Sequence, residues 1–430
     1  MAIGFRRRMC GFWSKYNSNV KHIYIFCMQS SGVVYGIGTY IKQLTETLKH
    51  EKDVSLNIVI RHSEEPEFII KEDDGVRTFY FPKINHPINS FNAQFDSVYN
   101  RNVCFLLFSN IRPKSSDKLI FHLNYYEEGS FIPYFKKYYP ECLVLFTIHY
   151  QRWSFLLNGN TTYFRKLMHN AKSDLSDNDK LVLQSCKAEK DVLQSVDRII
   201  CLAGYTKDIL MKDYAISQDK ISLIYNGLKD EGEILTKKEK LRLRKELFFE
   251  NDEILILFVG RLDKIKGLEK LIQAFKIILN DLPQARLVVV GDGDYNAYLK
   301  ECEGSWGKIT FTGRLNRELL YQFYQIADVG VMPSFHEQCS YVAIEMMMFG
   351  VPLVISTSTG LSEMIDDEFY PIKVDVLENE TTATVLPEEL AVKITAALSD
   401  KKQANNIRRN YLKKFLPTTM GNRYIHLTSQ

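Results

Sequence analysis

Residues 254–267 read Ile254-Leu-Ile-Leu-Phe-Val259-Gly-Arg-Leu-Asp-Lys-Ile-Lys-Gly267, an apolar run that ends in a basic loop. Six apolar residues without alternation are typical of a parallel β-strand that is buried on both faces. The next apolar residues share one face of a helix; they are Leu268, Leu271, Ile272, Phe275 and Leu279. The stretch therefore predicts a strand–loop–helix unit of an α/β domain.

The same alternation of strand and helix repeats along the chain in two blocks. A helix between consecutive strands implies a parallel sheet covered on both faces. We therefore predict an α/β fold with two doubly wound, Rossmann-like domains facing a cleft. The expected strands are 22–28, 56–60, 119–123, 143–148, 198–202 and 221–225 in the first block, and 254–259, 287–290, 309–312, 329–332 and 352–356 in the second. Helices are expected near 179–195, 295–302, 317–327 and 341–349, and around Ile41, Leu44 and Leu48.

A charged, lysine-rich crossing at 228–250 sets the expected domain boundary. The predicted division is a basic N-terminal extension at 1–21, a first Rossmann-like domain at 22–228, a second Rossmann-like domain at 229–402 and a helical tail at 403–430. The tail could pack back on the first domain. Ligands of such sheets bind at the carboxyl ends of the strands.

Composition indicates an ordinary globular protein and argues against several classes of function. The 430 residues carry a net charge of only +3, so no nucleic-acid partner is expected. The eight cysteines form no C-x-x-C pair and are interpreted as reduced core residues of a cytoplasmic protein. No apolar run approaches the ~18 residues of a membrane span. Residues 1–21 alternate basic and aromatic residues and could contact an anionic membrane surface, or could form a poorly ordered tail.

Two carboxylates stand out in the run from Pro333 to Pro352. Glu345 interrupts a segment, 341–349, that is otherwise apolar on every side and therefore predicts a buried helix. Because a buried carboxylate needs a partner, a ligand with hydroxyl groups could satisfy Glu345, and a distant arginine is the alternative. Glu337 precedes the helix, and Ser340 is a plausible N-cap that leaves free N–H groups for an anion. A nucleotide sugar offers both hydroxyls and negative charge.

The loop after strand 254–259 places Arg261, Lys264 and Lys266 just before a helix. Cations are unfavourable near a helix N-terminus by some tenths of a kcal/mol each, so their presence favours an anionic ligand. Arginine and lysine both suit phosphate oxygens. A solvated basic loop is the alternative interpretation.

These motifs, taken in order, resemble the nucleotide-binding half of GT-B glycosyltransferases of the family-four type, the retaining glycosyl transferases group 1. The matching positions are Gly260-Arg261-Leu262, Lys266-Gly267, the pair Glu337 and Glu345, Gly350-Val-Pro352 and Gly360-Leu-Ser-Glu363. In the first block the matches are Gly36 and Gly38, placed in a loop after the first strand, Thr147-Ile-His149, Val196-Asp197 and Asn226-Gly227. The resemblance covers about residues 22–400 of the printed sequence.

The resemblance implies a retaining glycosyltransferase that moves a sugar from a nucleotide diphosphate sugar to an acceptor. It implies catalytic roles for Arg261, Lys266, Glu337 and His149. The implied donor-binding residues are Gly36, Gly38, Gln338, Cys339, Ser340, Tyr341, Val342 and Glu345. No metal or other cofactor is expected, and Asp292-Gly-Asp294 is interpreted as a turn. The acceptor, expected in loops at 83–101 and 150–178, could be a saccharide, a lipid-linked saccharide or a peptide.

Three departures from the family pattern bear on donor choice. The usual Gly-Phe-Gly after the first glutamate is Gln338-Cys339-Ser340, the usual Gly-Gly is Thr359-Gly360, and the acid after Asn-Gly is displaced to Asp230. A catalytically inactive GT-B module that binds a sugar nucleotide or a partner protein remains an alternative. A dinucleotide enzyme is disfavoured, because the third glycine of its fingerprint is absent at both Ile41 and Asn296.

Overall fold

The computed structural model of this protein describes residues 19–28, 36–83, 93–169, 174–369, 371–400 and 403–430. The predicted membrane contact of the N-terminal segment therefore falls on residues, 1–18, that lie outside the described part of the chain. Among the described residues, no helix is both long enough and apolar enough to cross a membrane.

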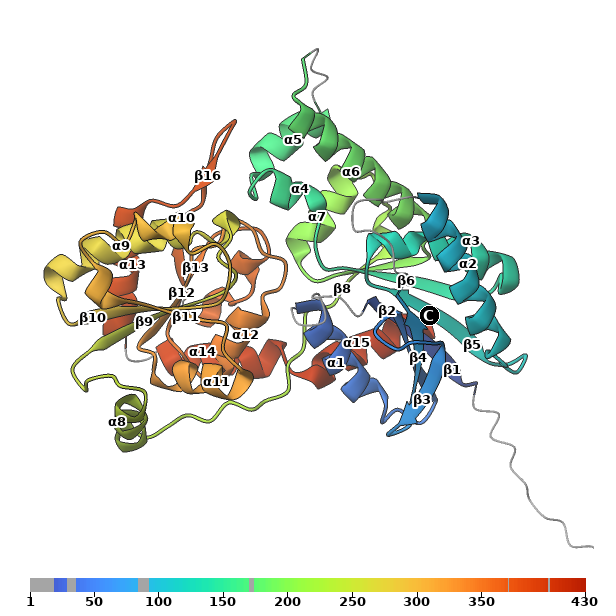
Figure 1. The fold of residues 1–430 in the computed structure, drawn as a ribbon, viewed down its shortest axis with the longest axis horizontal. Helices are drawn as coiled ribbons and strands as arrows, with labels where there is room; N and C mark the ends of the chain where they lie inside the picture. The colour runs from blue at the N-terminus through green and yellow to red at the C-terminus, as the bar shows by residue number, and fades with distance from the viewer. Residues whose placement is uncertain (1–18, 29–35, 84–92, 170–173, 370, 401–402) are drawn as a thin grey trace, which may run out of the picture.

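The first sheet has eight strands in the order β3-β4-β2-β1-β5-β6-β7-β8, and only β3 runs antiparallel to its neighbour. Their bounds are β1 Lys21–Met28, β2 Val54–Ser63, β3 Ile69–Asp73, β4 Val76–Pro82, β5 Lys118–Leu123, β6 Leu143–Ile148, β7 Arg198–Cys201 and β8 Ile221–Leu223. The helices described up to residue 212 of this domain are α1 Gly36–Leu48, α2 Ala93–Ser109, α3 Ile132–Tyr138, α4 Arg152–Leu156, α5 Thr161–His169, α6 Asp177–Ser195 and α7 Gly204–Lys212. We call this unit the first domain (Figure 1).

The second sheet has six parallel strands in the order β11-β10-β9-β12-β13-β14. They are β9 Ile254–Val259, β10 Ala285–Val290, β11 Ile309–Gly313, β12 Val329–Met332, β13 Leu353–Ser356 and β14 Ile372–Val374. The helices are α8 Lys237–Glu246, α9 Leu268–Asp281, α10 Asn296–Leu299, α11 Arg317–Ile326, α12 Tyr341–Met348, α13 Pro387–Ser399 and α14 Gln403–Lys414. A small hairpin, β15 Leu377–Glu378 with β16 Ala383–Thr384, completes what we call the second domain. The predicted α/β fold with two doubly wound domains is confirmed.

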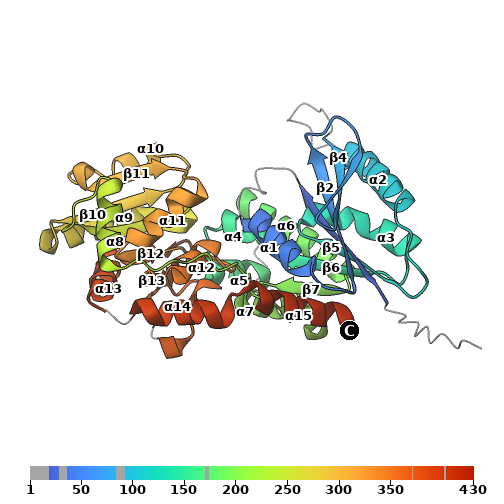
Figure 2. The ribbon, with the colours of Figure 1, turned by 90° about the horizontal axis from the view of Figure 1, so that it is seen from below.

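The C-terminal residues divide between the two domains, as Figure 2 shows along its lower edge. Helix α14 packs on α12 of the second domain, whereas α15 (Pro417–Ser429) packs on α1 of the first. Tyr424 of α15 is fully buried, and its hydroxyl lies 3.1 Å from Nδ1 of the buried His122 on β5. The expected return of the C-terminal helix to the first domain is thus observed, for α15 alone.

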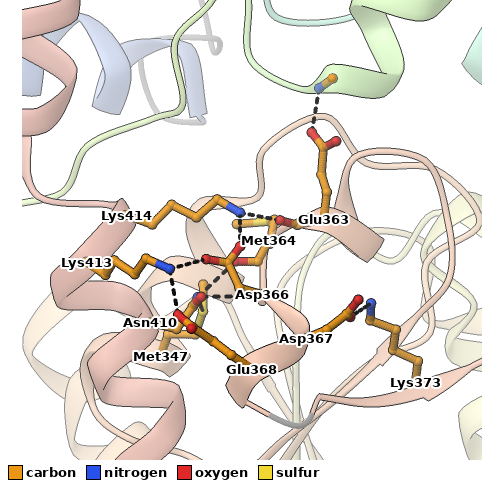
Figure 3. Close-up of polar contacts among 11 residues, drawn as sticks. Met347, Glu363, Met364, Asp366, Asp367, Glu368, Lys373, Asn410, Lys413 and Lys414 are labelled. Atoms are coloured by element: carbon orange, nitrogen blue, oxygen red, sulfur yellow. Dashed lines mark hydrogen bonds and ion pairs between the residues drawn. The ribbon is translucent and has the colours of Figure 1, made fainter.

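A polar cluster holds α14 against the loop that follows β13 (Figure 3). Lys413 and Lys414 both bind the carboxylate of Asp366, at 3.0 and 2.8 Å. Lys414 also donates to the backbone carbonyl of Glu363 at 2.5 Å. The side chain of Glu363 points the other way and accepts from the backbone N–H of Gly204, the first residue of α7. The loop therefore joins α14 to the first domain, with a carboxylate at a helix N-terminus, where it is favourable.

Two expectations about local structure were wrong. Gly36 and Gly38, expected in a loop, lie in the first turn of α1, and residues 29–35 before them lie outside the described part of the chain. The regions 83–101 and 150–178 were both expected to be loops. The first contains the start of α2, whose apolar residues Val103, Cys104 and Leu107 are buried in the core, and the second contains α4, α5 and the start of α6. The hairpin of β3 and β4 was not predicted; four of the five β3 residues are exposed, so its pattern carries no core signal.

We expect Gly421→Ala to lower the free energy of unfolding by about 1 kcal/mol or more, because α15 approaches α1 closely. A Cβ at Gly421 would overlap the Cγ2 methyl of Thr47. In a Thr47→Ser background that methyl is gone, so the same change should instead stabilise by up to about 1 kcal/mol through helix propensity. Thermal unfolding of the four proteins measures both effects. Equal effects of Gly421→Ala in the two backgrounds would contradict this packing.

Candidate active site

The strand order of each sheet reverses at one place, and this determines where a ligand can enter. In the second sheet the reversal lies between β9 and β12, and in the first between β1 and β5. Connections on either side of such a point leave on opposite faces, which opens a crevice at the carboxyl ends of the strands. A cavity of about 840 Å³ lies between the two domains and is lined by both. All twelve predicted site residues line it: Gly36, Gly38, His149, Arg261, Lys266, Glu337, Gln338, Cys339, Ser340, Tyr341, Val342 and Glu345.

The two cations predicted to bind phosphate follow β9 and differ in how they are held. Arg261 pairs with Asp263 at 2.9 Å, and both side chains are 43% exposed. Such an exposed pair contributes about 0–1 kcal/mol, so the guanidinium can turn to a ligand at little cost. Lys266 is more buried and lies 2.6 Å from Oε1 of Glu337. Both predicted cations of this loop therefore line the cavity. Arg261 is in an exposed ion pair, and Lys266 is in a more buried one.

Glu337 lies in the loop after β12, which we call the donor loop (residues 336–339). Its carboxylate accepts from Lys266 and from the Ser334 hydroxyl, the latter at 3.0 Å. Its backbone is also fixed, because the N–H donates to Thr359 Oγ1 at 2.9 Å and the carbonyl accepts from Gly360 N–H at 2.9 Å. Both bonds of the carboxylate involve Oε1, and none of the hydrogen bonds found among the described residues involves Oε2.

Glu345 stands on α12 with a partner that the sequence did not reveal. The hydroxyl of Tyr324, on α11, donates to Glu345 Oε2 at 2.8 Å. Burial raises the pKa of Glu345 to about 7, against the hydrogen bond from Tyr324 and the charge of Arg317, both of which lower it. The side chain of Arg317 itself pairs with Glu231 at 3.0 Å. The alternative of a distant arginine paired directly to Glu345 is therefore not what the described residues show.

The N-terminus of α12 has the predicted cap. Ser340 has extended backbone angles, and its Oγ accepts from the N–H of Ala343 at 3.4 Å. The preceding N–H groups, of Tyr341 and Val342, have no partner within the helix by geometry. Both residues line the cavity, so this helix end can meet an anion there.

His149 ends β6 and faces the same cavity from the first domain. Its Nε2 lies 2.9 Å from the side-chain oxygen of Asn124, which makes Nε2 the protonated nitrogen. Burial lowers the pKa of His149 to about 3, so the ring is neutral. The edge of the Tyr40 ring lies against it, with centroids 4.8 Å apart. A neutral, oriented imidazole can exchange hydrogen bonds with a hydroxyl but carries no charge near neutral pH.

The first domain holds the donor loop directly. The ring of His336 lies between Trp153 and Tyr205, with centroids 5.3 and 6.0 Å away. Asn226 donates to the Cys339 carbonyl at 2.7 Å, and Thr206 donates to Oε1 of Gln338. On the other side, a Cβ at Gly360 would overlap the Gln338 carbonyl oxygen, so only glycine fits there.

Several residues at the site were missed by the sequence reasoning. Asn124 follows β5 directly, and its place at a strand end was a usable signal. Tyr324 and Thr206 lie on helices far along the chain from the residues they contact, and only the tertiary fold brings them there. Among the described residues, no group of three or more histidine, cysteine, aspartate or glutamate side chains is arranged to hold a metal.

The raised pKa of Glu345 predicts a specific pH dependence of stability. Folding raises the pKa of this carboxyl group from 4.5 to about 7. The free energy of unfolding of the protein therefore falls as the pH rises through that range. Glutamine cannot ionise, so the Glu345→Gln variant does not have this pH dependence. We expect the free energy of unfolding of the variant, minus that of the parent, to be about 1–3 kcal/mol larger at pH 8 than at pH 5. Thermal unfolding of both proteins at the two pH values measures the change, and a difference that is independent of pH would contradict it.

A family of known proteins matches the second domain in sequence. Residues 239–414 match the family model Glycosyl transferases group 1. An uncharacterized glycosyltransferase of Methanocaldococcus jannaschii is 34% identical over 227 residues, which are 51% of this chain and 56% of that protein. The chain thus spans little more than half the length of that relative.

Solved structures match over nearly the whole chain. Sucrose-phosphate synthase from Thermosynechococcus elongatus has a TM-score of 0.69 at 20% identity, covering 95% of this chain and 99% of that one. HepE of Anabaena, in complex with UDP and glucose, has a TM-score of 0.68 at 14% identity, covering 96% and 100%. Residues 239–414 therefore resemble the glycosyl transferases group 1 model, and the chain as a whole shares the two-domain α/β fold of these solved structures.

Proposed function

We propose that this protein is a retaining glycosyltransferase of the family-four type that uses a nucleotide diphosphate sugar as donor. One observation carries the proposal: two cations after β9 and two carboxylates after β12 line a single cavity at the strand-order reversal of the second sheet. This arrangement offers cations to a diphosphate and acceptor oxygens to hydroxyl groups. HepE of Anabaena has been solved in complex with UDP and glucose and with UDP-glucose, which agrees with a nucleotide sugar as the partner here.

The proposed reaction breaks the bond between the anomeric carbon of the sugar and the diphosphate oxygen. The electron pair leaves with the diphosphate, and Arg261 and Lys266 stabilise the charge that develops there. The acceptor hydroxyl then attacks from the same face, and its proton passes to the departing phosphate oxygen. Because the leaving group takes that proton, no carboxylate base is required. The positive side chains fill the electrostatic role, so we propose that catalysis is independent of metal.

The two carboxylates bind different hydroxyl groups of the donor in this proposal. We propose that Glu345 accepts hydrogen bonds from the ribose diol, that Glu337 binds a hydroxyl of the transferred sugar and that His149 faces this sugar from the first domain. The Lys266–Glu337 ion pair then links the two ends of the donor: its cation faces phosphate and its carboxylate faces sugar. Gly36 and Gly38, in the first turn of α1, have no side chains to obstruct the donor on the opposite wall.

The acceptor would enter from the first domain, and its class stays open between a saccharide, a lipid-linked saccharide and a peptide. Tyr150 and Phe155 lie beside the cavity with ring centroids 6.3 Å apart, and Phe155 is 48% exposed. Exposed aromatic faces suit sugar rings and peptide side chains alike. A cytoplasmic location, with membrane contact through residues 1–21, belongs to the same proposal.

Arg261→Ala should lower kcat by about 10²–10³-fold, which is the usual effect of removing one group that stabilises charge in a transition state. The midpoint of thermal unfolding should hardly change, because the Arg261 side chain is 43% exposed and its ion pair with Asp263 lies at the surface. The comparison requires a sugar-transfer assay and a melting curve on the same preparation. Unchanged turnover would remove the diphosphate role of Arg261.

The donor is best identified by calorimetry with UDP, GDP, ADP and their sugars, first without metal and then with magnesium. One nucleoside diphosphate should bind in the micromolar range without metal, and Glu345→Ala should weaken it. Failure of a folded protein to bind any of them would contradict the proposal and favour the inactive module. Binding only with magnesium would contradict metal independence alone.

A further inference from the structure

Gln338 makes a hydrogen bond that spans the two domains. It lies in the donor loop next to Glu337, and its side chain is only 7% exposed. Its Oε1 accepts from the hydroxyl of Thr206, which is fully buried in the first turn of α7. Because the N–H at the start of α7 is itself bound by Glu363, the helix that carries Thr206 is also held to the second domain. The amide of Gln338 is therefore held from the first domain, with its oxygen on the Thr206 hydroxyl.

That orientation leaves the amide nitrogen of Gln338 without a partner. Nε2 is buried and makes no hydrogen bond to any described residue, and Gln338 lines the cavity together with Glu337 and His149. A buried N–H₂ group without an acceptor costs about 1–3 kcal/mol, so a ligand oxygen placed there would recover that free energy.

We propose that Nε2 of Gln338 donates a hydrogen bond to a hydroxyl oxygen of the transferred sugar, and that Thr206 is the positioning residue that holds the amide in this orientation. The inference rests on the proposed function, because it places the transferred sugar beside Glu337 and His149. Recognition of the sugar then depends on the first domain through Thr206, whereas recognition of the nucleoside diphosphate depends on Arg261, Lys266 and Glu345 of the second.

The orientation has a chemical consequence that separates it from the flipped amide. With Oε1 on Thr206, the cavity receives a hydrogen-bond donor, and a glutamate at 338 would replace that donor with a negative oxygen facing sugar hydroxyls and Glu337. With the amide flipped, the cavity would receive an acceptor, and a glutamate would serve equally well. Gln338→Glu therefore tests which atom faces the sugar.

The experiment compares a nucleoside diphosphate with its sugar conjugate by calorimetry, in the pairs UDP and UDP-glucose, GDP and GDP-mannose, and ADP and ADP-glucose. For the pair that the parent protein binds, Thr206→Val and Gln338→Ala should each weaken the sugar nucleotide about tenfold, the effect of one lost buried hydrogen bond. The diphosphate alone should bind as before. The double variant should be no weaker than either single one, because both remove the same contact.

Two matched variants separate positioning from a general loss of domain contact. Thr206→Ser keeps the hydroxyl and should restore most of the sugar-nucleotide affinity. Thr162→Val removes another hydroxyl that bonds across the domains, to Glu378 at 2.7 Å and away from the donor loop, and should leave the affinity unchanged.

Several outcomes would overturn the inference while leaving the proposed function in place. One is that Thr206→Val weakens the binding of the diphosphate and of the sugar nucleotide equally. Another is that Thr162→Val weakens sugar-nucleotide binding as much as Thr206→Val does. The third is that Gln338→Glu binds the sugar nucleotide as tightly as the parent does. If the folded parent binds none of the nucleotides, the proposed function fails, and this inference fails with it.

Discussion

Parallel strands impose the constraint on which the site depends. Each connection must return over a face of the sheet, so every strand delivers its next residues to the same edge. In the second domain β9 delivers Arg261 and Lys266 to that edge, and β12 delivers Glu337. In the first domain β6 delivers His149. Side chains far apart in the sequence therefore meet in one cavity without any local sequence signal for their meeting.

The charged side chains of this cavity are of both signs, and several of them have partners within the protein. Lys266 and Glu337 satisfy one another before any ligand arrives, and Glu345 is held by a neutral tyrosine hydroxyl. Under the proposed function, an anion binds Lys266 while a hydroxyl group binds the second oxygen of Glu337, so that neither of these partly buried charges loses its partner during binding. The donor loop that carries Glu337 is held by Asn226 and Thr206 of the other domain, which makes the site a property of both domains together.

The sequence predicted the fold and the members of the site for identifiable reasons. The uninterrupted apolar runs at β6, β9 and β12 match the strands to the residue, because buried parallel strands leave little ambiguity. The ordered motifs placed all twelve candidate residues on one cavity, although their individual roles stay predictions. What the sequence could not supply were contacts between helices and loops distant in the chain, such as Tyr324 with Glu345 and Thr206 with Gln338. Gly36 and Gly38 were placed in a loop because glycine usually ends regular structure, whereas here they begin a helix.

Helix α15 makes the first domain discontinuous, since its last element is encoded after the whole of the second. Tyr424 fills the space beside His122 only when residues 417–429 are present. During synthesis the first domain therefore emerges from the ribosome long before the helix that completes its core. Until then the surface of α1 and β5 that packs against α15 stays uncovered. A nascent chain of this protein cannot finish its first domain before it has made its second.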